Sequence, residues 1–256
     1  MKKYSNLLPA LVERISREVR HKKYPDKATK ARLHQLYGAY IQPNSSKKAQ
    51  ALINQLKPAS ELICHVKAQN EIINKLLKLH ASTSERLPYY GDFYDFIFNC
   101  VGTADKILDL GCGFNPFSLP FYPCLPTEYH AIDIDLHTKD LLNAFFDTLR
   151  IPKYAICEDL ETITPTAKAD LTLMLKLIPV LEANNPGRAY SLANGLNTTW
   201  LVATFPTKSL GGKKKGMALN YRAGFHDALN NNLLNNYRLV AESSIGNELV
   251  FVLRHE

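Results

Sequence analysis

The chain has 256 residues, of which 46% are hydrophobic, which is enough for a large packed core and too much for a disordered protein. This length suits one large domain, or a catalytic domain with a smaller appendage. The longest apolar run, residues 171–181, is interrupted by Lys176 and Pro179, so we expect no helix that spans a membrane. The five cysteines lack paired spacing, which predicts reduced thiols in a cytoplasmic protein without a metal site.

The formal net charge of +7 is unevenly distributed along the chain. Residues 1–85 hold 16 Lys and Arg against 6 Asp and Glu, whereas residues 86–256 hold 15 against 18. A basic segment on a slightly acidic body is typical of proteins that bind polyanions. A solvated helical surface has the same composition, so charge alone does not decide between the two.

Apolar spacing predicts helices for the first 80 residues. Leucine, valine and isoleucine recur at intervals of three and four within residues 7–15, and a similar repeat covers 33–37. Further helices are expected at 47–56, after a turn at 43–46, and at about 59–79. We therefore expect a helical N-terminal domain over residues 1–85.

After residue 104, short β-rich runs alternate with helical stretches. The expected strands are 106–110, 129–134, 154–157, 171–175 and 200–205, followed by a hairpin over 237–253. Such alternation is typical of βαβ units around a parallel sheet, and an antiparallel last strand is common at its edge. The predicted fold of residues 86–256 is α/β, a doubly wound sheet.

The sharpest motif is ILDLGCGFNP at 107–116. A strand carries Asp109 and then turns through Gly111, Cys112 and Gly113, where glycine lets the backbone bend tightly beside a ligand. A dinucleotide fingerprint has a third glycine where this chain has Pro116, which disfavours NAD or FAD.

Acidic residues also end the next two predicted strands. Asp133, followed by Ile134, is placed to accept hydrogen bonds from ribose hydroxyls. Asp159 and Leu160 follow the third strand, where a carboxylate and backbone groups meet an adenine. The ordered set resembles the class I methyltransferases, which have a Rossmann-like sheet and use S-adenosylmethionine.

Further segments resemble one narrower family, the aminoglycoside-resistance methyltransferases that modify N7 of guanine 1405 in 16S rRNA. The matching segments are LHQLYGAY (33–40), LHASTSERL (79–87), DFIF (95–98), LDLGCGFNPFSLP (108–120), LKLIPVLE (175–182), FPTKSLGGKKKGM (205–217) and IGNELVFVL (245–253). The resemblance implies S-adenosylmethionine as cofactor, the 30S ribosomal subunit as substrate, and aminoglycoside resistance as the result. It also implies that Arg86 contacts the cofactor, where a guanidinium is able to hold the methionine carboxylate through two hydrogen bonds. Nothing in the sequence indicates more than a monomer.

Three residues are expected to position the target base. Lys176 ends the fourth strand, and Lys208 and Ser209 follow the fifth. Guanine N7 has a free lone pair, so we expect alignment to supply most of the rate and no general base to be needed. Base flipping is also expected. Ser82 and Glu85 have capping-box spacing, which predicts that a helix begins there.

The basic segment is expected to bind rRNA through phosphates rather than base sequence. The predicted RNA-binding residues are Arg14, Arg17, Arg20, Lys22, Lys23, Lys27, Lys30, Arg32, Lys47 and Lys48, with Lys213, Lys214 and Lys215 in a glycine-containing loop. On this view, removing residues 1–78 abolishes methylation and spares cofactor binding.

Three alternatives stay open at this point. Adenine N1 at the same decoding site has similar chemistry, and only the resemblance separates it from guanine N7. A small-molecule methyltransferase is disfavoured by the basic segment. A non-catalytic rRNA-binding or ribosome-assembly module is disfavoured by the intact Asp109, Gly111, Gly113 and Asp133 set.

Overall fold

The computed structural model describes residues 4–41, 44–56, 66–152, 154–208 and 216–256. They include a seven-stranded sheet in the order β3-β2-β1-β4-β5-β7-β6. The strands are β1 (Lys106–Leu110), β2 (Glu128–Asp133), β3 (Tyr154–Cys157), β4 (Ala169–Leu175), β5 (Thr198–Pro206), β6 (Tyr237–Ile245) and β7 (Glu248–His255). The first five are parallel, and β7 is antiparallel to both β5 and β6. The predicted doubly wound sheet and its antiparallel C-terminal hairpin are confirmed.

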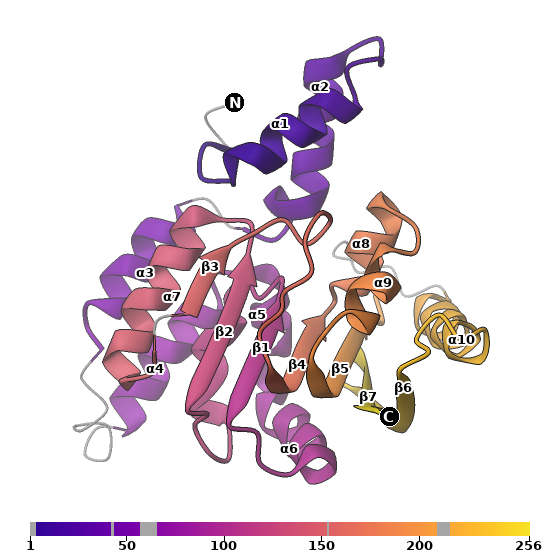
Figure 1. Ribbon diagram of the computed structural model, residues 1–256. Coiled ribbons are helices and arrows are strands. Elements are labelled where there is room, and N and C mark those ends of the chain that lie inside the picture. The colour runs from indigo at the N-terminus through magenta and orange to yellow at the C-terminus, as the bar shows by residue number, and fades with distance from the viewer. Residues whose placement is uncertain (1–3, 42–43, 57–65, 153, 209–215) are drawn as a thin grey trace.

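Helices cover the two faces of this sheet because neighbouring residues of each strand point to opposite sides. Ile107 of β1 packs in the core on one face, and Leu108 packs in the core on the other. The first face carries α3 (Ser45–Ile53), α4 (Val66–Leu77), α6 (Tyr90–Val101) and α7 (Leu136–Leu149), and the second carries α8 (Ile178–Asn184), α9 (Arg188–Asn194) and α10 (Met217–Asn230) (Figure 1). No helix in the described ranges is long and apolar enough to cross a membrane.

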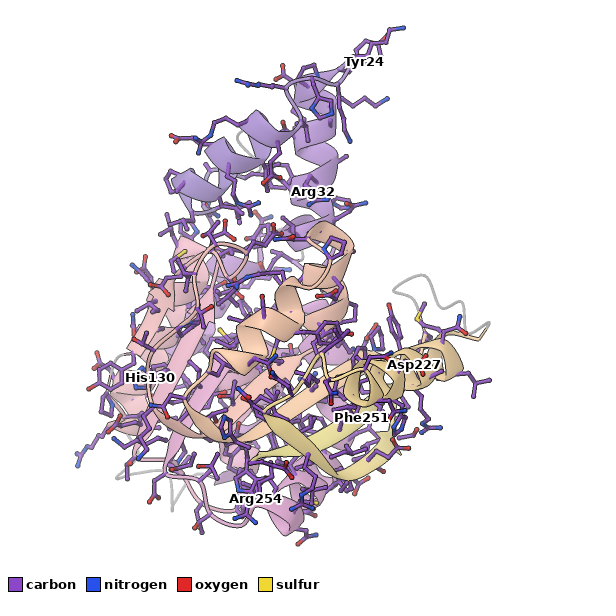
Figure 2. The ribbon with its side chains drawn as sticks, turned by 45° about the vertical axis from the view of Figure 1, so that its right-hand side comes forward. Tyr24, Arg32, His130, Asp227, Phe251 and Arg254 are labelled. Carbon is purple, nitrogen blue, oxygen red and sulfur yellow. The ribbon has the colours of Figure 1, made fainter. Side chains whose placement is uncertain are left out.

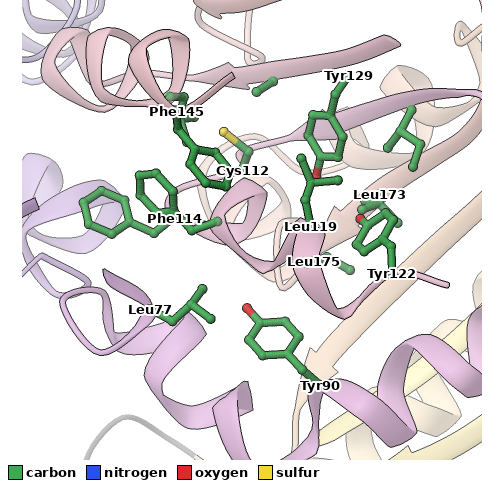
Figure 3. Packing of buried hydrophobic residues seen from close by; sticks show 14 of the residues in the cluster. Leu77, Tyr90, Cys112, Phe114, Leu119, Tyr122, Tyr129, Phe145, Leu173 and Leu175 are labelled. Carbon is green, nitrogen blue, oxygen red and sulfur yellow. The ribbon is translucent and has the colours of Figure 1, made fainter. Parts of the chain in front are cut away.

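Aromatic rings fill the core on the first face. Figure 3 shows Tyr90, Phe114, Tyr122 and Phe145 in this core. The ring centroid of Tyr94 of α6 lies 5.6 Å from that of Tyr90 and 4.3 Å from that of Tyr122. The 3₁₀ helix Asn115–Phe121 directly follows the glycine turn, and its Phe117 packs edge-to-face on Phe145 of α7. The turn after β1 is therefore followed by a helix that packs on buried aromatic rings.

The N-terminal helices α1 (Pro9–Glu18) and α2 (Pro25–Leu33), with a π-helical turn at His34–Gly38, form a separate small core. The members of this core are Tyr4, Leu7, Leu11, Ile15, Leu33 and Tyr37. The unit stands above the carboxyl edge of the sheet (Figure 1). It is joined there by backbone hydrogen bonds, one from Leu8 to Ile134 and one from Leu136 to Asn6, both of 2.9 Å.

The helices of residues 1–85 thus belong to two different cores. The unit that contains α1 and α2 has its own, whereas Ile53 of α3 and Leu76 of α4 lie in the core of the sheet. The division between the two cores therefore does not fall at residue 85, the domain boundary that the sequence predicts. The expected helix at 59–79 is present from Val66 to Leu77, and residues 57–65 lie outside the described part of the chain.

The packing of β7 against α10 predicts a large stability effect at Phe251 (Figure 2). Phe251 is fully buried, with its ring centroid 4.6 Å from that of Phe225. Phe251→Ala is expected to lower the free energy of unfolding by about 3–5 kcal/mol, since it leaves a cavity between strand and helix. Denaturant unfolding measures this. Val240→Ala, on the exposed edge strand β6, is the control and should change stability by less than about 0.5 kcal/mol. Equal effects of the two variants would contradict this packing.

Candidate functional site

A hollow at the carboxyl edge of the sheet, here called the edge pocket, brings together most of the predicted cofactor residues. Its lining includes Arg86, Gly111, Cys112, Gly113, Asp133, Ile134, Asp159, Leu160 and Lys176. These residues come from the ends of four parallel strands and from α5 (Ala81–Arg86). Open α/β sheets commonly bind ligands at this position.

The glycine turn has the geometry that the sequence predicts. Gly111 and Gly113 have φ values of 63° and 49°, which residues with a side chain rarely adopt. A Cβ on Gly111 would lie 2.9 Å from Leu177, and one on Gly113 would lie 2.9 Å from the ring of His80. Both glycines are therefore required by the backbone conformation and by close neighbours.

Asp133 lies in the pocket wall beside this turn. Its carboxylate accepts backbone hydrogen bonds from Gly113 at 2.8 Å, Ile134 at 2.7 Å and Asp135 at 3.1 Å. Burial raises the pKa of its carboxyl to about 6, against the effect of these donors. At neutral pH the group is mostly ionised and remains an acceptor for hydroxyl groups.

Asp109 differs from the expectation because it does not line the pocket. The side chain is fully buried, and its Oδ2 accepts hydrogen bonds from Asn115 at 2.9 Å and from Tyr129 at 2.7 Å. A strand residue directed beneath the turn cannot also face the ligand. Asp109 therefore holds the 3₁₀ helix against β2, and the acids that face the pocket follow the second and third strands.

Arg86 also departs from the expected arrangement. Its Nε and Nη2 donate to the two carboxylate oxygens of Glu248, at 3.0 and 2.8 Å, and its Nη1 donates to Asn115 at 3.0 Å. The edge of the guanidinium expected to grip a ligand carboxylate is thus bonded to Glu248. Arg86 still lines the pocket, and its place beside the cofactor stays a prediction.

Lys176 lies between the edge pocket and a neighbouring hollow, here called the side pocket. Its Nζ is 2.8 Å from Glu85 and 3.3 Å from Glu248, and the residue has a positive φ of 58°. The side pocket is lined by residues that include Gln35, Glu85, Pro179, Lys208 and Tyr221. Both pockets share Leu36, Tyr40, Ser82, Lys176 and Val180. The predicted target-positioning residue Ser209 lies outside the described residues.

A helix begins at this segment as predicted, but Ser82 does not cap it. Helix α5 starts at Ala81, so Ser82 lies in its first turn, and the N-cap residue His80 makes no side-chain capping bond. The hydroxyl of Thr83 instead bonds back to the carbonyl groups of Leu77 and His80. Ser82 and Glu85 are left to line the pockets.

The N-terminal unit forms one wall of the edge pocket, which the sequence did not predict. Leu11 of α1 and Leu36, Tyr37, Tyr40 and Ile41 all line it. Tyr37 donates a short hydrogen bond to Asp135, two residues after Asp133. Removal of residues 1–78 would open this wall, so the structure favours weakened cofactor binding over the retention expected from the sequence.

Most predicted RNA-binding cations are exposed on the protein surface. The exposed ones are Arg17, Arg20, Lys22, Lys23, Lys27, Lys30, Lys47 and Lys48. Lys47 and Lys48 are on α3, which packs on α7 rather than on the N-terminal unit. Arg32 is half-buried and donates to the Asn184 carbonyl at 3.1 Å, which joins α2 to the end of α8 (Figure 2). Lys213, Lys214 and Lys215 lie outside the described residues.

Arg14 does not belong with the other exposed cations. Its Nε is 2.8 Å from Asp159 and its Nη1 is 2.9 Å from Glu161, and both acids line the edge pocket. The guanidinium is thus directed at the pocket wall. An RNA contact of Arg14 stays a prediction, and in this structure its guanidinium is engaged with these two acids.

Comparison with known proteins identifies the family. A model of the family described as "Ribosomal RNA methyltransferase (FmrO)" matches residues 2–252. The chain belongs to this family. A relative from Serratia marcescens, named 16S rRNA (guanine(1405)-N(7))-methyltransferase, is 35% identical over 99% of this chain and 94% of its own. A relative of the same name from Micromonospora echinospora is 33% identical over 99% of this chain and 92% of its own.

Two solved rRNA methylase structures have the same fold as this FmrO-family chain. That of the 16S rRNA methylase RmtB has a TM-score of 0.82 at 31% identity and covers 100% of this chain and 94% of its own. That of RmtF in complex with S-adenosyl-L-homocysteine has a TM-score of 0.81 at 31% identity, with 99% and 93% covered. The predicted fold class and family are thereby confirmed.

The lining of the edge pocket fits S-adenosylmethionine, the cofactor of this FmrO-family fold. Asp133 offers an acceptor for ribose hydroxyls, and Ile134 and Leu160 are apolar walls for an adenine ring. Arg86 and Lys176 line the same pocket, and each is paired with acids, Arg86 with Glu248 and Lys176 with Glu85 and Glu248. The acceptor and the apolar walls suit the nucleoside part of the cofactor.

The raised pKa of Asp133 predicts pH-dependent cofactor binding. Above about pH 6 the carboxylate is ionised and accepts hydroxyl donors, and below it the group is protonated and loses an acceptor. Affinity for S-adenosylhomocysteine should therefore fall by about fourfold as pH decreases from 7.5 to 5.5, in proportion to the ionised fraction of the carboxyl group. Titration calorimetry measures this. Asp133→Asn should bind more weakly and lose most of the dependence, and constant wild-type affinity over this range would contradict the assignment.

Proposed function

We propose that the protein transfers a methyl group from S-adenosylmethionine to N7 of guanine 1405 in 16S rRNA, and so confers aminoglycoside resistance. The observation that carries this proposal is the full-length match to relatives of that named activity. The two adjoining pockets support it because one suits the cofactor and the other is open to a base beside it. The bound cofactor supplies an electrophilic methyl group on sulfur.

The chemistry around the shared wall suits a target that needs no proton removed. His80 lines the edge pocket, but burial first, and then the charges of Arg86 and Lys176, lower its pKa to about 3. A general base with so low a pKa is ineffective at neutral pH. Glu85 is bonded to Lys176. Guanine N7 has a free lone pair and demands alignment only.

Lys176 favours guanine over adenine in this proposal. A guanine that presents N7 to the edge pocket also presents O6, an acceptor, beside it. The ammonium group of Lys176 belongs to both pockets and is a donor only. An adenine that presents N1 would bring its amino group, also a donor, to the same place. Lys176, with Lys208 in the side pocket, is proposed to position the base.

The exposed cations of α1, α2 and the link between them are proposed to bind rRNA phosphates, as clustered Lys and Arg commonly do. These helices lie at the carboxyl edge of the sheet, and the end that carries Tyr24 is far from the sheet (Figure 2). We propose the assembled 30S subunit as substrate, acted on by a single copy of the protein.

The deciding experiment incubates purified 30S subunits, or naked 16S rRNA, with the protein and S-adenosylmethionine. Borohydride reduction and aniline cleavage then map 7-methylguanine. One new cut at guanine 1405, dependent on cofactor and stronger on subunits, is expected. Methyl incorporation without that cut would overturn the N7 target. No incorporation, with S-adenosylhomocysteine still bound in a titration, would leave a module that binds cofactor without this activity.

The proposed role of Lys176 predicts a defect in turnover without a change in pH profile. Lys176→Met should lower kcat on 30S subunits by about 10- to 100-fold, because the base is less well aligned. The shape of the pH–rate curve should stay unchanged, since no proton is transferred through Lys176. Lys106→Met, which removes a surface ion pair with Glu128 at the start of β1, is the control and should retain activity. A curve that loses a limb in Lys176→Met would show that the lysine acts as an acid or base.

A further inference from the structure

Arg14 joins the N-terminal helices to the far end of the edge pocket. It lies on α1, yet its two pocket partners, Asp159 and Glu161, are about 150 positions later in the chain. Its Nη1 also lies 2.6 Å from Glu18, one turn along α1. The side chain is only 17% exposed, so water screens these ion pairs weakly.

The two carboxylates depend on this guanidinium. Asp159 accepts the backbone N–H of Glu161 at 3.1 Å through Oδ1, so its other oxygen is the one bonded to Arg14. Oε1 of Glu161 is buried without a hydrogen-bond partner among the described atoms. Burial raises the pKa of the Glu161 carboxyl, and the charge of Arg14 acts in the opposite direction. Without Arg14, two neighbouring acids would share a poorly solvated site and repel each other.

Helix α1 also touches the same end of the pocket elsewhere. The backbone N–H of Leu8 bonds to the carbonyl of Ile134, and the side chain of Leu11 lines the pocket. Ile134 directly follows Asp133, and Asp159 and Leu160 lie opposite, after β3. A single helix therefore contacts both segments between which an adenine would lie.

We propose that Arg14 is a positioning residue for the cofactor, and that through it rRNA docking on α1 and cofactor binding strengthen each other. Arg14 acts by holding Asp159 and Glu161 in place rather than by touching a reacting atom. The second half of the proposal rests on the proposed function, because Arg17 on α1 and Arg20, two residues after its end, are exposed.

The first test measures S-adenosylhomocysteine binding by calorimetry on the full-length protein without RNA. Arg14→Ala should weaken binding by roughly 10-fold, the effect of losing one charge-assisted positioning contact. Arg14→Lys should recover part of the affinity, since an ammonium neutralises the acids but cannot span both. The control is Arg238→Ala on β6. This variant removes a surface ion pair with Glu256 and should leave the affinity unchanged.

A double variant separates positioning from simple bracing of the fold. If Arg14 acts through the carboxylates, Glu161→Gln in the Arg14→Ala background relieves the repulsion and restores part of the affinity. A brace would give additive losses and a parallel fall in melting temperature. In turnover assays, Arg14→Ala should raise KM for S-adenosylmethionine and leave kcat on 30S subunits within about 2-fold. This is the result expected when the lost interaction stabilised the bound cofactor and the transition state equally. Additive losses, or unchanged affinity in a folded Arg14→Ala protein, would overturn the positioning role.

The second test measures the coupling between the two ligands. In the wild type, saturating 30S subunits should tighten S-adenosylhomocysteine binding by about 5-fold or more, and the cofactor product should tighten subunit binding by the same factor. Arg14→Ala should reduce this factor toward one. Equal affinities with and without subunits in the wild type would overturn the coupling. Because the first test contains no RNA, a wrong substrate assignment would affect only this second test.

Discussion

The site depends on a cluster of four charges, formed by the buried Arg86, Lys176 and Glu248 and the half-buried Glu85. Glu248 is 3% exposed and lies between the two cations, and Lys176 also reaches Glu85. Burial alone would raise the pKa of the Glu248 carboxyl, but the charges of Arg86 and Lys176 outweigh it and lower that pKa. The cluster is neutral as a whole, which makes its burial tolerable, and removing one member leaves an uncompensated charge. It joins α5, the end of β4 and the start of β7, and so sets the boundary between the two pockets.

Much of the fold was predictable because its signals are local. Short β-rich runs between helical stretches locate the strands, and the glycines at 111 and 113 locate the turn where β1 ends. What the sequence could not show was pairing across long separations. Arg86 with Glu248, and Arg14 with Asp159, are joined only by the tertiary fold. The sequence of a basic helix does not show which of its arginines pair with acids elsewhere in the chain, so the pairing of Arg14 with Asp159 and Glu161 could not be predicted.

The N-terminal unit and the sheet are less separate than composition indicates. Residues 1–85 are more basic than residues 86–256. Leu11, Tyr37 and Tyr40 of the basic segment nevertheless line the edge pocket together with residues of the sheet. Helices α3 and α4 belong to the basic N-terminal segment of the sequence, but they pack in the core of the sheet. One segment of the chain thus contributes both the surface that would meet RNA and the surface that would meet the cofactor. Substitutions there are best judged by which way each side chain faces.

The shared wall of the two pockets has a consequence for inhibition. Five residues line both hollows, so the two pockets adjoin one another there. They are Leu36, Tyr40, Ser82, Lys176 and Val180. A single molecule that joins an adenosine group to a purine by a short linker would occupy both at once. Tethering makes the second contact intramolecular and adds affinity without new contacts. Selectivity over other enzymes that use the same cofactor would come from the side pocket, whose walls include the C-terminal helix α10 through Met217 and Tyr221.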